Sequence, residues 1–126
     1  MLRVMLKSKI HRGTVTGASI DYEGSISIDT VLMAAADILP HEQVHVLDVD
    51  NGARLTTYAI AGGPGEICVN GAAARLVEVG DRVIILTYTE LSAAELAGYE
   101  PLVIRVDESN AVSAAMPVAE ADRKGV

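Results

Sequence analysis

Two adjacent residues, Gly24 and Ser25, interrupt a segment that otherwise has β-branched residues at alternate positions. Glycine followed by serine is common in turns and bulges, which is the simplest interpretation of the pair. A chemical interpretation is also open, because a serine hydroxyl can attack the carbonyl carbon of the preceding residue where the local backbone is strained. Glycine favours this attack, since it tolerates unusual φ and ψ angles and has no Cβ to shield the carbonyl carbon. Completion of the reaction would cleave the chain and convert Ser25 into a ketone, a pyruvoyl group.

Cationic and phenolic side chains in two other segments could hold an anion beside such a ketone. Lys9 and His11 are two residues apart, so in a strand they project from the same face. Arg54 and Tyr58 are four residues apart and share a face in the same way, and Thr57 precedes Tyr58. Thr57 or a tyrosine could donate the hydrogen bond that the oxyanion of an acyl transfer needs. These residue types suit a small dicarboxylate, whereas charge in the segment of Lys9, taken alone, is more typical of a solvated edge strand.

The composition argues against several classes of protein. Seventeen acidic and ten basic residues give a formal charge of -7, which disfavours nucleic acid as a partner because phosphate binding needs clustered Lys and Arg. No apolar run approaches the ~18 residues of a membrane span and no cleavable signal is apparent, so we expect a cytoplasmic protein without a membrane partner. Cys68 is the single cysteine and is interpreted as a buried small hydrophobe. The aromatic residues are four tyrosines, so the core is expected to be aliphatic.

Familiar cofactor and metal motifs are absent from the sequence. It has no phosphate-binding loop, no dinucleotide-binding glycine motif and no cysteine pair, so no nucleotide or zinc site is expected. His41 and His45 have the i,i+4 spacing of helical metal ligands. Pro40 and the alternating segment that follows favour a strand instead, which directs the two imidazoles to different places. We therefore expect no metal site.

Short extended segments separated by turns predict a mainly β protein, a barrel or a sandwich, in one domain of residues 1–126. Asn51-Gly52 lies between two such segments and predicts a type I′ hairpin turn, in which both central residues have φ > 0. This hairpin would put Arg54 and Tyr58 on its second strand. The segment 81–91 is almost continuously apolar, so we expect it to be covered on both faces. Further strands are expected within residues 2–18, 67–70 and 101–107.

Two short helices and a frayed end complete the expected elements. Asp29 can N-cap a helix over about residues 30–37. Ser92, with Glu95 three residues later, makes a capping box for a second short helix. The sequence becomes small and polar toward its end, so residues from about 114 to 126 are expected to fray.

Three segments together resemble the signature blocks of one enzyme family. They are KIHRGTVTGASIDYEGSISID (9–29), NGARLTTYAI (51–60) and VNGAAARLVEVGDRVII (69–85). In order and spacing they are similar to the bacterial aspartate 1-decarboxylases, which depend on a pyruvoyl group. The resemblance covers nearly the whole chain and is weakest after about residue 98. It implies a carboxy-lyase that converts L-aspartate to β-alanine and CO2, for the biosynthesis of pantothenate and coenzyme A.

The resemblance also implies how the chain matures and assembles. Self-cleavage would fall between Gly24 and Ser25, giving a β chain of residues 1–24 and an α chain of residues 25–126 that begins with the pyruvoyl group. This covalent group would form a Schiff base with aspartate, so that no pyridoxal phosphate is needed. The implied fold is a small double-psi β-barrel with two or three short helices. The implied assembly is a homotetramer with active sites between neighbouring subunits.

Individual roles follow from the resemblance at matching positions. Tyr58 corresponds to the proton-donating tyrosine, Thr57 to a threonine needed for self-cleavage, and Lys9 and Arg54 to the substrate-binding cations. We expect Arg54 to hold the side-chain carboxylate, because a cation tight against the departing α-carboxylate would stabilise the ground state. The other positions that match the family's self-cleavage or substrate-lining residues are Tyr22, His11, Asn70, Gly71, Ala72 and Ala73.

Two other functions stay open from the residues alone. Ser25 could be the nucleophile of a serine hydrolase with His11 as base, but the sequence lacks a G-x-S-x-G elbow and an evident acidic partner for the histidine. A non-catalytic β-barrel could bind a small dicarboxylate at Arg54 and Lys9. Both alternatives predict an unbroken chain.

Overall fold

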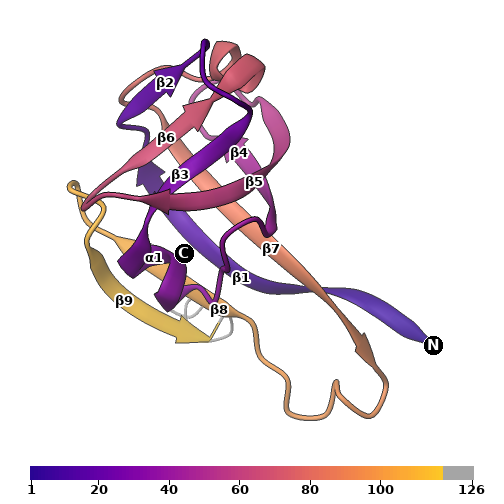
Figure 1. Cartoon of the computed structure of the whole chain (residues 1–126). Helices are drawn as coiled ribbons and strands as arrows, with labels where there is room; N and C mark the ends of the chain where they lie inside the picture. Colours follow the sequence, from indigo (N-terminus) through magenta and orange to yellow (C-terminus); the bar gives the residue numbers. More distant parts are fainter. Residues whose placement is uncertain (118–126) are drawn as a thin grey trace.

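The computed structural model describes residues 1–117, which form a nine-stranded sheet and two short helices (Figure 1). The helices are α1 (Thr30–Ala35) and the 3-10 helix η1 (Gly71–Leu76). The prediction of a mainly β protein with two or three short helices is confirmed. In chain order the strands are β1 (Leu2–Thr14), β2 (Gly17–Ser19), β3 (Ser25–Asp29), β4 (Gln43–Asp48), β5 (Arg54–Gly62), β6 (Ile67–Asn70), β7 (Arg82–Ser92), β8 (Leu102–Val106) and β9 (Val112–Pro117).

The sheet curls so that its edge strand β2 comes back to the end of β1, the strand before it in the chain. The strand order is β2-β6-β3-β5-β4-β7-β1-β8-β9, so β1 and β2 are consecutive in sequence but far apart in this order. Between them, the Thr16 N–H donates to the Ile67 carbonyl at 2.8 Å, and the Thr16 hydroxyl accepts the Ile67 N–H at 3.0 Å. Gly13 passes so close that a Cβ on it would lie 2.6 Å from the Ile67 side chain. These contacts agree with a small closed barrel, and the double-psi type stays a prediction.

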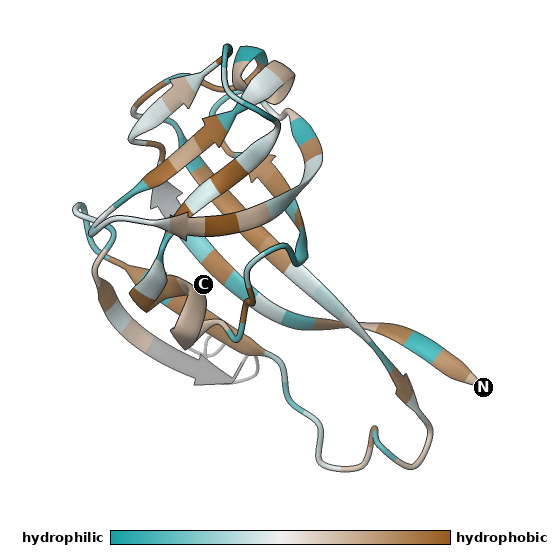
Figure 2. Ribbon diagram, in the orientation of Figure 1, coloured by the Kyte–Doolittle hydropathy of each residue, from teal (hydrophilic) through white to brown (hydrophobic). Residues whose placement is uncertain are grey.

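Aliphatic side chains fill the interior of the barrel. Along β3, Ile26 and Ile28 are fully buried in the core, and along β6, Ile67 and Val69 are their counterparts. Strand side chains alternate between faces, which Figure 2 displays as brown residues alternating with paler ones. The polar residues that alternate with these isoleucines and the valine along β3 and β6 therefore face away from the core. No aromatic side chain belongs to the core cluster of residues 1–117, as predicted.

The start of α1 is confirmed in its details. Asp29 Oδ1 accepts the Val31 N–H at 2.8 Å, so Asp29 is the N-cap, and Leu32 and Met33 are buried beneath the helix. The helix ends at Ala35, two residues before the end of the expected range of 30–37. Neither helix within residues 1–117 has the length and apolar character required to cross a membrane.

The turn between β4 and β5 is wider than the type I′ turn that the sequence predicts. The two strands are antiparallel, so the hairpin itself is confirmed. The Asp48 carboxylate accepts the N–H groups of Asp50 and Asn51 at 2.8 and 3.2 Å. Gly52 has a φ of 77°, whereas Asn51 has no positive φ. The type I′ prediction is wrong because the Asp48 side chain stabilises a longer loop.

The predicted helix after Ser92 is wrong, although its capping box is present. The Ser92 N–H donates to the Glu95 carboxylate at 2.8 Å, and the Glu95 N–H donates to Ser92 Oγ at 3.3 Å. Residues 93–98 nevertheless form turns, and Gly98 ends them with a φ of 75°. A cap can start a helical turn, but a single turn before a glycine is too short to propagate.

The start of β1 and the end of β7, which pair antiparallel, project beyond the barrel as a two-stranded arm (Figure 1). Leu2, Val4 and Tyr88 are exposed on this arm. The expectation that 81–91 is covered on both faces therefore holds for the first half of β7 and not for its end. At the other end of the chain, β9 pairs with β8 up to Pro117, so fraying from about residue 114 is wrong there, and residues 118–126 lie outside the described part.

Candidate active site

Ser25 begins β3 and lies directly opposite Asn70 at the end of β6. Its side chain is on the face of β3 that points away from Ile26 and the core, yet it is only 1% exposed. Asn70 Nδ2 donates to Ser25 Oγ at 2.9 Å, and the Ser25 hydroxyl donates to the Glu23 carbonyl at 3.3 Å. Burial and two hydrogen bonds fix this hydroxyl beside the peptide bond that it would attack.

The residue before it, Gly24, is in backbone contact with Gly71, the first residue of η1. A Cβ on Gly71 would lie 2.7 Å from Gly24 Cα, 2.8 Å from Gly24 N and 3.2 Å from the Tyr22 carbonyl oxygen. Gly71 also has a φ of 79°, a conformation that favours glycine. Gly24 itself has no positive φ, and a Cβ on it would meet nothing within 4 Å. The backbone conformation that requires glycine was expected at Gly24, and the structure has it at Gly71 instead.

Tyr58 is the next neighbour of Ser25 on β5. The parallel register pairs Ile26 with Ala59, so Ser25 and Tyr58 occupy the preceding position on each strand. Tyr58 is 37% exposed, and its ring centroid lies 6.2 Å from that of His41. Alternation puts Tyr58 on the same outward face as Ser25.

Arg54 and Thr57 occupy opposite faces of the same strand. Arg54 is exposed like Tyr58, which agrees with their predicted shared face. Thr57 pairs with the buried Val44 and is half-buried on the side of the core. Among the hydrogen bonds of residues 1–117, none involves the Thr57 side chain, so its predicted role as an oxyanion donor stays a prediction.

Lys9 and His11 form a second group, on β1. His11 pairs with Arg105 of β8, and His11 Nδ1 and Arg105 Nε are both buried without a hydrogen-bond partner within residues 1–117. Burial lowers the pKa of His11 below its ordinary value, and the nearby charges of Lys9, Arg105 and Arg12 lower it further. Sequence reasoning did not find Arg105, because no local signal places β8 beside β1.

The lowered pKa of His11 has a consequence for stability that can be measured. Because the folded state binds the His11 proton less tightly than the unfolded state, the free energy of unfolding will fall as the pH drops below 6.5 toward the lower pKa of the folded protein. The His11→Gln variant will lack this part of the pH dependence in chemical denaturation between pH 7 and about 5. A variant with the same slope as the parent chain would show that His11 binds its proton equally well in both states.

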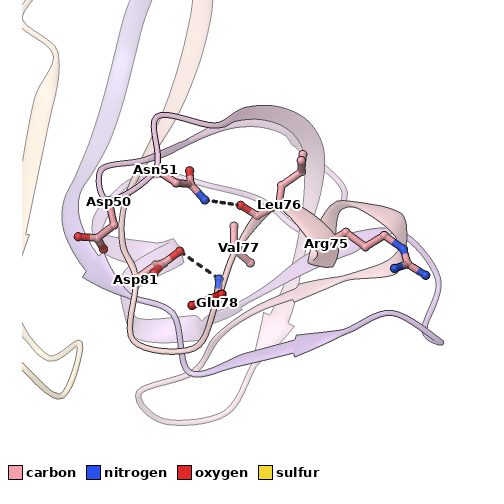
Figure 3. A pocket seen from close by; sticks show the side chains of 7 residues that line it. All are labelled: Asp50, Asn51, Arg75, Leu76, Val77, Glu78 and Asp81. Atoms are coloured by element: carbon pink, nitrogen blue, oxygen red, sulfur yellow. Dashed lines mark hydrogen bonds between the residues drawn. The ribbon is translucent and has the colours of Figure 1, made fainter.

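A cavity of about 290 Å³ lies apart from all of these residues, beside the end of η1 (Figure 3). Its wall joins the β4–β5 loop to η1, since Asn51 Nδ2 donates to the Leu76 carbonyl at 2.8 Å. Nearby, carboxylate oxygens of Asp48, Asp50 and Asp81 lie within 4.8 Å of one another. Burial raises the pKa of Asp48, and the neighbouring Asp81 carboxylate raises it further. None of the predicted site residues lines this cavity, whose residues are Asp50, Asn51, Arg75, Leu76, Val77, Glu78 and Asp81.

Comparison with known proteins gives the family. The family model described as aspartate decarboxylase matches residues 1–113. The chain is 56% identical over 114 residues to aspartate 1-decarboxylase 2 of Gloeobacter violaceus, covering 89% of this chain and 91% of that protein. It is 57% identical over 112 residues to aspartate 1-decarboxylase of Thermoanaerobacter pseudethanolicus, covering 87% and 96% of the two chains. The corresponding enzyme of Moorella thermoacetica is 57% identical over 116 residues, covering 90% and 91%. The resemblance of the three sequence blocks is thereby confirmed, and the chain belongs to the aspartate decarboxylase family.

Proposed function

We propose that this chain cleaves itself between Gly24 and Ser25 and uses the resulting pyruvoyl group to decarboxylate L-aspartate to β-alanine for pantothenate synthesis. Membership of the family and the names of its relatives support the reaction. The observation that carries the proposal is the buried Ser25 hydroxyl, which accepts the Asn70 N–H at 2.9 Å while Gly71 packs on the adjacent Gly24. This surrounding fits a serine that is consumed to make the group.

Ser25 supplies all the carbon atoms of the pyruvoyl group. Its Oγ bonds to the Gly24 carbonyl carbon, the Gly24 C–N bond breaks, and the hydroxyl proton moves to the Ser25 nitrogen, which gives an ester. Removal of the Ser25 Cα proton then breaks the Cβ–Oγ bond, and Gly24 leaves as a carboxylate. Water then adds to the resulting dehydroalanine. Its nitrogen departs as ammonia and a ketone remains. The Asn70 N–H would stabilise the negative charge on Oγ as its proton leaves, and again as the Cβ–Oγ bond breaks.

In the mature enzyme, the ketone supplies an acceptor for the electrons that remain when CO2 leaves the substrate. Arg54, on the exposed face of β5, would bind the side-chain carboxylate of aspartate and orient it. Tyr58, beside Ser25 in the register, would donate the proton that replaces the lost carboxyl group. A positioned proton donor of this kind accelerates a reaction about 10²- to 10⁴-fold.

The two groups of predicted site residues support an assembly in which subunits share active sites. Lys9 and His11 lie on β1, between β7 and β8 in the sheet, whereas Ser25 lies on β3 and both Arg54 and Tyr58 lie on its neighbour β5. We therefore expect Lys9 and His11 of one subunit to complete the Ser25 site of a neighbour in a homotetramer. The exposed apolar residues Leu2, Val4 and Tyr88 on the projecting arm are suited to subunit contacts. The placement of His11 on β1 and Ser25 on β3, two strands that are not neighbours in the sheet, also disfavours a serine hydrolase.

The reaction can be tested with purified mature protein. L-aspartate should give β-alanine and CO2 in equal amounts, and borohydride added with aspartate should leave a covalent adduct on the fragment of residues 25–126. Protein treated with borohydride alone and then exposed to aspartate is the control, and it should carry no adduct. A protein that binds aspartate and releases no CO2 would instead be a dicarboxylate-binding barrel.

A further inference from the structure

The Asn70 side chain lies at the centre of a small polar network on the outward face of β3 and β6. The antiparallel register places Ser25 opposite Asn70 and Ser27 opposite Cys68. Asn70 Nδ2 donates to Ser25 Oγ at 2.9 Å and to Ser27 Oγ at 3.1 Å. At the other end of the same amide, the Cys68 thiol donates to Asn70 Oδ1 at 3.4 Å. Both ends of the carboxamide thus have partners of the required polarity.

The orientation of this carboxamide decides what Ser25 encounters. The oxygen and nitrogen ends of an asparagine amide are nearly equal in size, so the neighbouring donors and acceptors select the orientation. The single proton of the Ser25 hydroxyl is donated to the Glu23 carbonyl, so toward Asn70 this hydroxyl can only accept. The Cys68 thiol is a donor at Oδ1, and the Ser27 hydroxyl is a second acceptor at Nδ2. Both favour the orientation in which Nδ2 faces Ser25.

We propose that Cys68 and Ser27 are positioning residues for self-cleavage, which hold the Asn70 amide with its N–H toward Ser25 Oγ. The inference rests on the proposed function. Negative charge is present on Ser25 Oγ as its proton leaves for the Ser25 nitrogen, before the new bond passes that charge to the Gly24 carbonyl oxygen. It returns to Oγ when the Cβ–Oγ bond breaks and Gly24 leaves as a carboxylate. An N–H in front of Oγ stabilises that charge, whereas a flipped amide would present its carbonyl oxygen and repel it.

The thiol of Cys68 is in the state that this role needs. Burial raises the pKa of Cys68, and the nearby Glu66 carboxylate raises it further. The sulfur therefore keeps its proton at neutral pH and can donate to Asn70 Oδ1. A thiolate could only accept, and it would favour the flipped amide.

A pair of variants at Cys68 separates the hydrogen bond from packing. Alanine and serine are both smaller than cysteine, and they differ from each other by one hydroxyl that can replace the thiol as donor. The rate of self-cleavage is measured on freshly purified unprocessed chain by intact mass, as the first-order loss of the 126-residue species. We expect C68A to cleave about 3- to 10-fold more slowly than the parent chain and C68S to retain the parent rate within about twofold, as for the loss and replacement of one hydrogen bond. Equal rates for C68A and C68S would overturn the proposal.

Variants of Ser27 give a second and independent test if C68A folds poorly. S27A removes the acceptor for the second Asn70 N–H, and S27T keeps it, so S27A should be the slower of the two. Thermal unfolding of every variant is measured alongside, because a purely structural role would make the rates follow the melting temperatures and not the presence of the hydrogen-bonding group. If the parent chain cleaves and all the variants cleave at its rate, this inference alone fails. If the parent chain does not cleave, the proposed function fails with it.

Discussion

The Ser25→Ala variant will remain a single unbroken chain of 126 residues and will form no β-alanine from aspartate. Alanine has no Oγ, so the acyl group of Gly24 has nothing to move to and no ketone can form. Both effects should be complete, because the buried hydroxyl that accepts the Asn70 N–H is also the source of the group that decarboxylates. A denaturing gel and an assay for β-alanine measure the two effects on the same preparation.

Ser19→Ala is the matched control for this variant. Ser19 is exposed in β2, and its side chain makes no hydrogen bond within residues 1–117. The control should cleave and turn over like the parent chain. Decarboxylation by Ser25→Ala at the parent rate would show that the electron acceptor comes from elsewhere.

The Gly71→Ala variant will lose self-cleavage by a factor on the order of a hundred or more, the usual cost of displacing reacting groups by about 1 Å. The added Cβ would lie 2.7 and 2.8 Å from two backbone atoms of Gly24, neither of which can rotate away. Either η1 or the segment that carries Gly24 must therefore move, and the distance from Ser25 Oγ to the Gly24 carbonyl carbon changes with it. The unprocessed fraction, followed by intact mass over time, measures the effect.

Gly98→Ala separates this clash from backbone strain. Gly98 has a φ of 75°, close to the 79° of Gly71, but a Cβ on it would meet nothing within 4 Å. Both variants pay the conformational cost of a positive φ, about 1 kcal/mol or somewhat more. Gly98→Ala should be less stable than the parent chain and still cleave at the parent rate. Cleavage of Gly71→Ala as fast as that of Gly98→Ala would show that the contact with Gly24 has no role.

The features that could be predicted from the sequence are those that depend on residues near one another in the chain. The alternating β-branched residues Ile26 and Ile28 indicated the extended segment that forms β3, and Asp29 predicted the start of α1. Local signals failed at two turns, the predicted type I′ turn that Asp48 widens and the capping box that no helix follows. Such signals start a turn and do not determine how far it extends.

The geometry of the candidate site depends on strand register, which local patterns do not fix between distant segments. The resemblance to the family supplied Asn70 and Gly71 as site positions. It did not supply the Cys68 thiol behind the Asn70 amide, the backbone contact of Gly71 with Gly24, or Arg105 beside His11. These contacts arise because β3, β6 and β8 are aligned by tertiary packing of the core.

The intact masses of purified, fully active protein test the central claim most directly. We predict two species, residues 1–24 ending in an ordinary carboxylate and residues 25–126 lighter by one ammonia than a chain that begins with serine. The larger species should also lack a free amino terminus. Active protein that consists only of unbroken chains with an unmodified Ser25 would contradict the account.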